Sequence, residues 1–195
     1  MDELAWGCLM NFFLAVKLRN IFLLAVALAM FDGCRKTGQL DAPEEIRARA
    51  LEFAGLYAQS ETEYEMGGQD PLRVVRIDCS GLVVMCYKYA LVDTGYGLPF
   101  EDASAAAMYD LYSRNTDSPV AGDLIFMGAP ESADITHITL FQEKKDGIIY
   151  FIDSTKKPAE GDYPEVNGVS ERHYPEGDPH FKSFGVMQVV RAELE

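Results

Sequence analysis

The stretch RIDCSGLVVMCYKYA, residues 76–90, constrains the fold most strongly, because it is apolar on nearly every side of any helix that it could form. A helix of that composition has no side left for solvent and is expected in the middle of a core. Cys79 follows Asp78 and lies just before the continuous apolar residues of this stretch, whereas Cys86 lies among them. We therefore expect a central helix over residues 80–91, with Cys79 at its N-terminus.

The position expected for Cys79 suits a nucleophile. A thiolate, and not a thiol, attacks carbonyl carbons. The partial positive charge at a helix N-terminus stabilises a thiolate, and the unpaired backbone N–H groups there can receive an oxyanion. Gly81 would leave room for a substrate beside the first turn. Cys86, in contrast, is interpreted as a core residue.

Composition and cysteine spacing exclude several other classes of protein. The net charge of -14 predicts a surface that repels nucleic acid and anionic lipid. The four cysteines form no C-x-x-C pair and no zinc-site spacing. Cys79 and Cys86 would lie about 10.5 Å apart along one helix, which is too far for a disulfide. A chain of 195 residues with 25% charged residues fits one compact domain with some additional sequence.

Helical periodicity precedes strand alternation along the chain. A helix is expected to begin at Asp41-Ala42-Pro43-Glu44, with Asp41 as its cap, and to be followed by the central helix and a shorter helix over residues 103–112. The later part of the chain carries strand patterns at residues 123–127, 135–142, 147–153 and 184–192. Residues 156–182 are interpreted as a polar loop that holds His173 and His180 in solvent. Helices followed by an antiparallel sheet predict an α+β fold.

A base and its orienting partner are predicted on two neighbouring strands. His137 lies inside a strand pattern, and alternation puts it on one face with Thr139. A three-residue hairpin loop at residues 145–147 would pair Thr139 with Asp153. His137 would then lie diagonal to Asp153, and a register shorter by one pair would put the two directly opposite. An imidazole and a carboxylate can meet at either separation. Asp153 is thus a candidate to orient the imidazole, or else a strand-end turn residue.

Three further side chains are candidates for the substrate or oxyanion site. Asp78 can cap the helix that begins at Cys79, or contact the substrate. Ser80 has the same two options. Tyr64 can donate its hydroxyl group to the oxyanion or to the substrate, or only pack.

The N-terminal region is typical of an export signal. Residues 21–31, IFLLAVALAMF, form an apolar run behind Lys17 and Arg19. The run is short for a membrane span and fits the hydrophobic region of a signal peptide, with an uncleaved anchor or a core helix as alternatives. We interpret residues 1–34 as a signal peptide, residues 35–42 as a tether and residues 43–195 as the folded domain.

Gly33-Cys34 resembles the end of a bacterial lipoprotein signal, in which Cys34 would carry the lipid. Cleavage after Ala29 is the competing possibility. In both cases we expect the protein to be exported to the bacterial cell envelope. With a lipid on Cys34, it would be anchored to a membrane and would face the periplasm.

Five short motifs follow one another in a defined order: Tyr64-x-x-Gly67-Gly68, Asp78-Cys79-Ser80-Gly81-Leu82-Val83, Gly122-Asp123-Leu124-Ile125-Phe126, the strand histidine His137, and Ile152-Asp153-Ser154. Any one of them alone would be a weak signal. Together they resemble the NlpC-type family of cell-wall cysteine peptidases, over about half of the chain.

The resemblance implies a papain-like α+β fold, in which N-terminal helices present the nucleophile at the start of a central helix packed on an antiparallel β-sheet. It also implies a hydrolase of peptidoglycan stem peptides that cuts between D-glutamate and a diamino acid. Cys79 would be the nucleophile, His137 the base and Asp153 the orienting residue, where the family often has histidine. No metal or cofactor is implied, and we expect a monomer.

Two other functions remain open from the sequence. The same thioester chemistry could serve an amidase, or an acyl or peptide transferase, because only the acceptor differs. A non-catalytic cell-wall binding module is the third reading, although the presence of Cys79, His137 and a polar partner opposes it. In each case residues 156–182 are expected to border the substrate cleft.

Overall fold

The computed structural model describes residues 38–70, 75–159 and 165–192, and its compact unit begins at Gln39. The predicted signal segment, Cys34 and residues 35–37 of the predicted tether lie outside the described residues. The helices are α2 (Glu44–Ala58), α3 (Cys79–Leu91) and α4 (Ala105–Leu111). The strands are β1 (Leu40–Asp41), β2 (Thr62–Glu63), β3 (Gln69–Asp70), β4 (Val75–Ile77), β5 (Tyr96–Gly97), β6 (Ser113–Asn115), β7 (Leu124–Met127), β8 (His137–Lys145), β9 (Ile148–Lys157), β10 (Val166–Pro175) and β11 (Phe181–Arg191).

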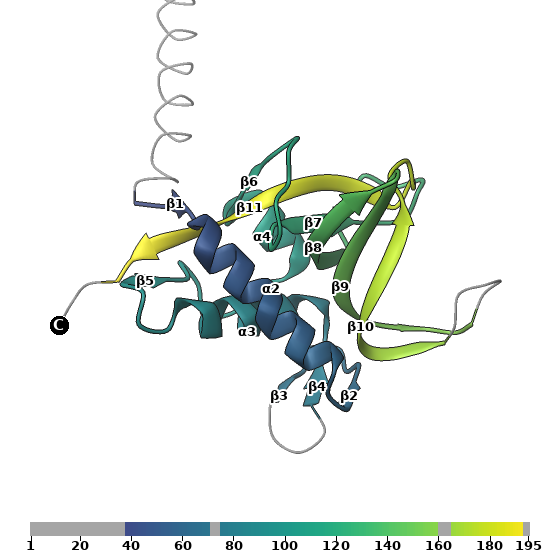
Figure 1. Cartoon of the computed structure of the whole chain (residues 1–195), viewed down its shortest axis with the longest axis horizontal. Coiled ribbons are helices and arrows are strands. Elements are labelled where there is room, and N and C mark those ends of the chain that lie inside the picture. The colour runs from purple at the N-terminus through teal and green to yellow at the C-terminus, as the bar shows by residue number, and fades with distance from the viewer. Residues whose placement is uncertain (1–37, 71–74, 160–164, 193–195) are drawn as a thin grey trace, which may run out of the picture. The chain divides into compact units, whose positions relative to one another are not determined.

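Within the described residues, the main sheet has eight strands in the order β1-β11-β7-β8-β9-β10, and β5 and β6 also pair with β11. All of its pairings are antiparallel. Helix α3 contacts α2 as well as β8 and β9, and Figure 1 shows α2 crossing in front of α3. A small sheet of β2, β4 and β3 precedes α3. The expected order of helices first and antiparallel sheet second is confirmed.

Helix α3 is the central helix that its composition predicts. Its buried residues lie on all sides of the helix, and they are Cys79, Gly81, Leu82, Val83, Val84, Cys86, Tyr87, Ala90 and Leu91. Burial on every side fixes the helix in rotation and in position. The first residue of α3, Cys79, is therefore placed by the core.

The Gly122-Asp123 pair fastens the start of β7 to the helices. Gly122 has a φ of +88°, and a Cβ atom there would lie 1.9 Å from the carbonyl oxygen of Arg47, so only glycine fits. The hydroxyl group of Tyr87 donates a hydrogen bond of 2.9 Å to the Gly122 carbonyl oxygen. The guanidinium of Arg47 donates to the buried carboxylate of Asp123 at 2.6 Å. Helices α2 and α3 are thus both tied to β7.

Helix α2 buries Ile46, Ala50 and Ala54 as its periodicity predicts, but its cap differs from the expectation. Pro43 occupies the N-cap position and makes no side-chain cap hydrogen bond. Asp41 instead belongs to β1 and pairs with Gln188 of β11. Asp41 pairs with β11 and lies two residues before the N-cap, so it does not cap α2. The sheet therefore begins inside the stretch that we interpreted as a tether.

The interpretation of residues 156–182 as a polar loop is wrong. Strand β10 lies within this stretch and pairs with β9 from Val166 opposite Lys157 to Pro175 opposite Ile148. It is the edge strand of the sheet, with exposed and partly exposed residues along much of its length. Polar residues, a glycine and a proline are compatible with such an edge and hid its strand character.

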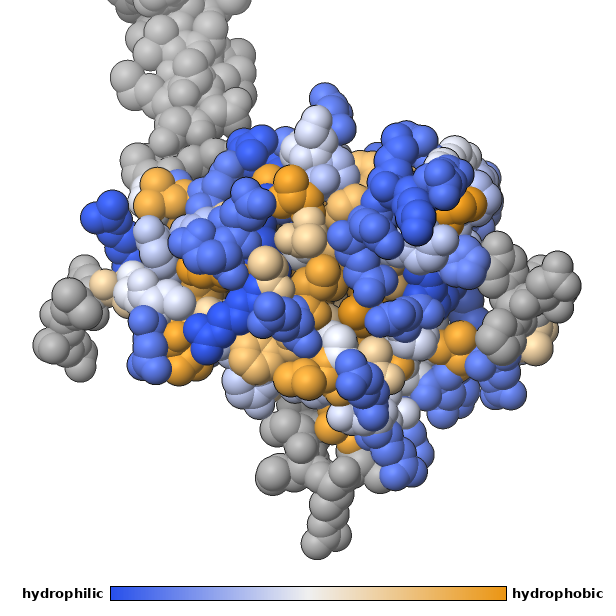
Figure 2. Space-filling view, in the orientation of Figure 1, coloured by the Kyte–Doolittle hydropathy of each residue, from blue (hydrophilic) through white to orange (hydrophobic). Residues whose placement is uncertain are grey.

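The surface is acidic and its apolar residues are scattered. On the face shown in Figure 2, hydrophobic side chains lie among hydrophilic ones. The large hydrophobic residues exposed in the described part of the chain come from several elements and turns, and they are Leu40, Leu56, Met66, Tyr89, Val92 and Leu111. Over the same described residues, no helix has the length and apolar character that a membrane crossing requires.

Candidate active site

Cys79 and Cys86 are both free thiols in α3, but they differ in environment. Cys79 is the first residue of the helix and keeps 8% of its surface exposed. Cys86 is completely buried, and burial raises the pKa of its thiol far above the usual value. Cys79 is thus the thiol that a small molecule can reach, and Cys86 is a core residue.

Asp78 caps α3 and ties it to the preceding turn. Its Oδ1 atom accepts hydrogen bonds from the backbone N–H of Gly81 at 2.7 Å and from the Ser80 hydroxyl group at 3.0 Å. Its Oδ2 atom accepts one from the backbone N–H of Gly67 at 2.8 Å. The capping role considered for Asp78 is therefore observed, and the same carboxylate positions the Gly67 turn beside Cys79.

His137 and Asp153 meet on the sheet. The Nε2 atom of His137 lies 2.6 Å from Oδ2 of Asp153, a carboxylate that is completely buried. His137 begins β8 and Asp153 lies in β9, where Leu140 pairs with Ile152 as the predicted register requires. The hairpin itself differs from the expectation: its loop has two residues, Asp146 and Gly147, and a bulge follows near Glu143.

The imidazole of His137 also interacts with Cys79. Because Nε2 is bonded to Asp153, the other ring nitrogen, Nδ1, is the one available to the thiol. Burial lowers the pKa of His137, but hydrogen bonds to Asp153 and Cys79, together with their negative charges, outweigh burial and raise the pKa to about 9. The structure thus brings together the three side chains that the sequence predicted as nucleophile, base and orienting residue, with His137 between Cys79 and Asp153.

Arg172 is a residue of this site that the sequence analysis missed. It lies in β10, and its Nη1 atom donates a hydrogen bond of 2.8 Å to Oδ2 of Asp153. The guanidinium also donates to the hydroxyl group of Tyr174. The alternation of Ser170, Arg172 and Tyr174 along one strand face was the available signal, but it lay in the stretch interpreted as a loop.

Tyr64 and Ser80 lie at the edge of the same site. Tyr64 is partly buried, and its pKa is raised by burial and then by the charges of Cys79 and Asp78, so its phenol is close to both. Its hydroxyl group points to the sulfur of Met66 at 3.8 Å. Ser80 uses its hydroxyl group to bond Asp78. Contacts of these residues with a substrate or an oxyanion stay predictions.

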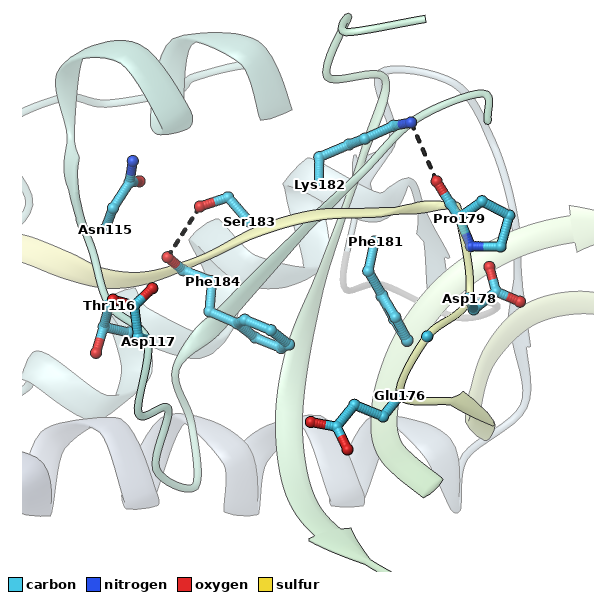
Figure 3. Close-up of a pocket in the computed structure, with 11 residues that line it drawn as sticks. Asn115, Thr116, Asp117, Glu176, Asp178, Pro179, Phe181, Lys182, Ser183 and Phe184 are labelled. Carbon is cyan, nitrogen blue, oxygen red and sulfur yellow. Dashed lines mark hydrogen bonds between the residues drawn. The ribbon is translucent and has the colours of Figure 1, made fainter. Parts of the chain in front are cut away.

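A separate hollow of about 520 Å³ lies between the β6–β7 connection and the turn before β11, and none of Cys79, His137 and Asp153 lines it. Figure 3 shows the rings of Phe181 and Phe184 on one side of β11, where a bulge shifts the alternation. Two carboxylates of the hollow are already paired, Glu176 with Lys144 and Asp178 with His180. Among the described residues, no group of three or more His, Cys, Asp or Glu side chains is arranged to hold a metal ion.

Comparison with protein families identifies the fold. The model of the family described as NlpC/P60 matches residues 61–161, which is more than half of the chain. The chain belongs to the NlpC/P60 family. The match includes Cys79, His137 and Asp153, and the resemblance noted from the sequence is confirmed. Membership of the NlpC/P60 family and the order of elements together confirm the papain-like α+β fold.

Several solved structures resemble this NlpC/P60 chain at low sequence identity. One is a protein described as similar to lipoprotein, NLP/P60 family, from Staphylococcus aureus, with 20% identity, a TM-score of 0.49, and coverage of 78% of this chain and 44% of that one. Ly7917 has 12% identity, a TM-score of 0.47, and coverage of 75% and 62%. The endolysin LysIME-EF1 has 17% identity, a TM-score of 0.37, and coverage of 75% and 63%.

The chain thus spans between 44% and 63% of the length of these solved proteins. A comparison with curated protein sequences gives no match.

Proposed function

We propose that this protein is an exported peptidoglycan hydrolase, a cysteine endopeptidase that cleaves stem-peptide amide bonds, with the bond between D-glutamate and a diamino acid as the first candidate. The observation that carries the proposal is one imidazole joined to both Cys79 and Asp153 at the N-terminus of a buried helix, in a chain of the NlpC/P60 family. Cys79 is the nucleophile, His137 the base and Asp153 the residue that orients His137.

Export is proposed from the sequence of residues 1–34, with the residues between Cys34 and β1 as a tether to the domain that follows. Attachment to a membrane through a lipid on Cys34 belongs to the same proposal. The substrate would then be the peptidoglycan of the cell envelope, and the protein would act as a monomer.

The first half of the reaction forms a thioester. The thiolate of Cys79 attacks the carbonyl carbon of the scissile amide, a C–S bond forms, and the carbonyl oxygen takes the negative charge. The imidazolium of His137 then gives its proton to the leaving amine, and the C–N bond breaks. Because Nε2 is bonded to Asp153, this proton moves through Nδ1, which faces the thiol.

The first turn of α3 supplies donors for the oxyanion. The N–H of Gly81 is used by the Asp78 carboxylate, and the N–H of Leu82 is used by the Asp78 carbonyl group. We therefore assign the oxyanion to the N–H groups of Cys79 and Ser80, which precede them. Tyr64, whose phenol is close to the thiol, is the candidate for an additional donor.

The second half of the reaction releases the product. Neutral His137 takes a proton from water, the hydroxide attacks the thioester carbon, and the C–S bond breaks to give a carboxylic acid and the Cys79 thiolate. Asp153 stabilises the imidazolium that forms in this step and keeps the ring oriented. The same thioester would react with an amine in a transferase, so the acceptor has to be determined by experiment.

Digestion of purified peptidoglycan tests the proposal. The protein is incubated with peptidoglycan beside Cys79→Ala and, as a matched control, Cys86→Ala, and the soluble products are identified by mass spectrometry. We expect stem-peptide fragments with new amine and acid ends from the parent and from Cys86→Ala, and none from Cys79→Ala. Fragments that carry an added amine would show transfer, and fragments from Cys79→Ala would contradict the proposal.

A further inference from the structure

The carboxylate of Asp153 has two cationic partners on one oxygen atom. Oδ2 is 2.6 Å from Nε2 of His137, which comes from β8, and 2.8 Å from Nη1 of Arg172, which comes from β10 on the other side. The second oxygen, Oδ1, is buried and has no hydrogen-bond partner among the described residues. The negative charge of Asp153 is therefore balanced by these two residues, and both act at the same atom.

Arg172 is held in a fixed orientation. Its guanidinium carbon lies 5.6 Å from the centre of the Phe151 ring and 5.1 Å from that of Tyr174, and the group is 12% exposed. It also donates to the Tyr174 hydroxyl group. A planar guanidinium packed on rings in this way presents its N–H groups in one direction. Arg172 is therefore a fixed point from which Asp153 can be positioned.

Burying a negatively charged carboxylate is costly unless a positive charge compensates it. His137 cannot provide that charge throughout the reaction, because it becomes neutral when it gives its proton to the leaving amine. The guanidinium of an arginine does not give up its proton in proteins, so Arg172 can provide the positive charge throughout. The groups that act on the carboxylate are His137 from β8, Arg172 from β10 and, through the imidazole, Cys79 from α3; Lys157 lies farther out, over the ring of Tyr174.

We propose that Arg172 is the fourth member of the site, a positioning residue that acts through Asp153. It compensates the buried negative charge of Asp153 and keeps the Oδ2 atom in place while His137 alternates between its charged and neutral forms. The four side chains then carry alternating charges in the order thiolate, imidazolium, carboxylate and guanidinium. The consequence for the reaction rates rests on the proposed function, whereas the effect on His137 does not.

The titration of His137 tests this role without any substrate. The imidazole signals of the protein are followed by NMR against pH, and His137 is assigned with His137→Gln. In Arg172→Met the imidazolium of His137 alone compensates the buried carboxylate, so we expect the imidazole to hold its proton more tightly and its pKa to rise by about one unit. Arg172→Lys, which restores the charge, should return the pKa toward that of the parent.

Two further variants make the comparison decisive. Arg114→Met removes an exposed arginine that pairs with Asp41, far along the sheet order from β9, and should leave the titration of His137 unchanged. If Arg172→Met fails to fold, Arg172→Gln keeps N–H donors for Asp153 without the charge and should give the same upward shift.

A pKa of His137 that is equal in the parent, Arg172→Met and Arg172→Gln would overturn the proposal, and so would a Lys variant that behaves as the Met variant does. With a peptidoglycan substrate, kcat/KM is measured against pH. The pKa of the alkaline limb of this profile should rise by the same amount as the pKa of His137. If no substrate is cleaved by the parent but the titration shifts as described, the proposed function fails and the role of Arg172 stands.

Discussion

His137 and Asp153 lie on neighbouring strands, two residues out of register, and their side chains meet at 2.6 Å. The diagonal arrangement turns the imidazole so that Nε2 faces β9 and Nδ1 is left for Cys79. The orientation of the base is thus set by the hairpin of β8 and β9, whereas the position of the nucleophile is set by the burial of α3.

Asp153→Asn should impair the reaction strongly. An amide has nearly the volume of the carboxylate but cannot stabilise the imidazolium, and it leaves Arg172 without its ionic partner. We expect kcat/KM on a stem-peptide substrate to fall about 100-fold or more. The pKa of His137 should fall as well, because the carboxylate raises it. Steady-state kinetics and NMR titration measure the two effects, and an unchanged rate in a folded variant would argue against the orienting role.

The raised pKa of His137 predicts a stability that depends on pH. In the unfolded chain His137 titrates near 6.5, and in the folded protein near 9. Its contribution is therefore complete below about pH 6.5 and disappears as the pH rises through 9, with an upper limit of about 3 kcal/mol. Urea unfolding of the parent and of His137→Gln between pH 6 and pH 10 measures it. The difference in unfolding free energy should shrink with increasing pH, and a constant difference would refute the pKa assignment.

Asp78→Ala should reduce both stability and activity. The variant loses the N-cap of α3 and the link to Gly67, and we expect the free energy of unfolding to decrease by about 1–2 kcal/mol. Activity per folded molecule should also fall, since Cys79 and the turn beside it are no longer fixed. Ser104→Ala is the matched control, because Ser104 caps α4 through Ala107 and is not part of the site. Equal activities of the two variants would mean that Asp78 has only a capping role.

Arg47→Met should destabilise the protein without changing its chemistry. Removing the guanidinium leaves the carboxylate of Asp123 buried and without its cation, which costs about 3–5 kcal/mol. Arg49→Met on the same helix is the control, since Arg49 donates to the carbonyl groups of Ala90 and Val92 at 3.3 Å, lies over the Phe53 ring and has no buried carboxylate as its partner in these contacts. Thermal unfolding compares the two, and a decrease for Arg47→Met no larger than that for Arg49→Met would contradict this account of the β7 attachment.

The core helix and the pairing of base and carboxylate could be predicted because both depend on local patterns. An apolar run preceded by a capping aspartate predicts α3 and the position of Cys79, even when the elements that pack against the helix are unknown. The register at Asp153 was predicted for a partly wrong reason. The loop is one residue shorter than expected, and the bulge near Glu143 adds the residue back before the strands reach Leu140 and Ile152.

Arg172 could not be predicted in the same way because its strand lies at the edge of the sheet. Edge strands often carry charged and polar residues, so the composition of β10 resembles that of a loop. The cap of α2 was missed for a different reason. Asp41 pairs with Gln188, and the composition of residues 41–44 does not indicate a partner so distant in the sequence.

The central claim is that Cys79 is a nucleophile activated by His137. Alkylation by iodoacetamide at pH 7, resolved by residue through peptide mapping, tests it most directly, with the parent and His137→Ala compared under the same conditions. Cys79 should be modified rapidly in the parent and much more slowly in His137→Ala, while the buried Cys86 remains unmodified in both. Equal rates at Cys79 in the two proteins would show that the imidazole does not activate the thiol, and the proposed mechanism would be wrong.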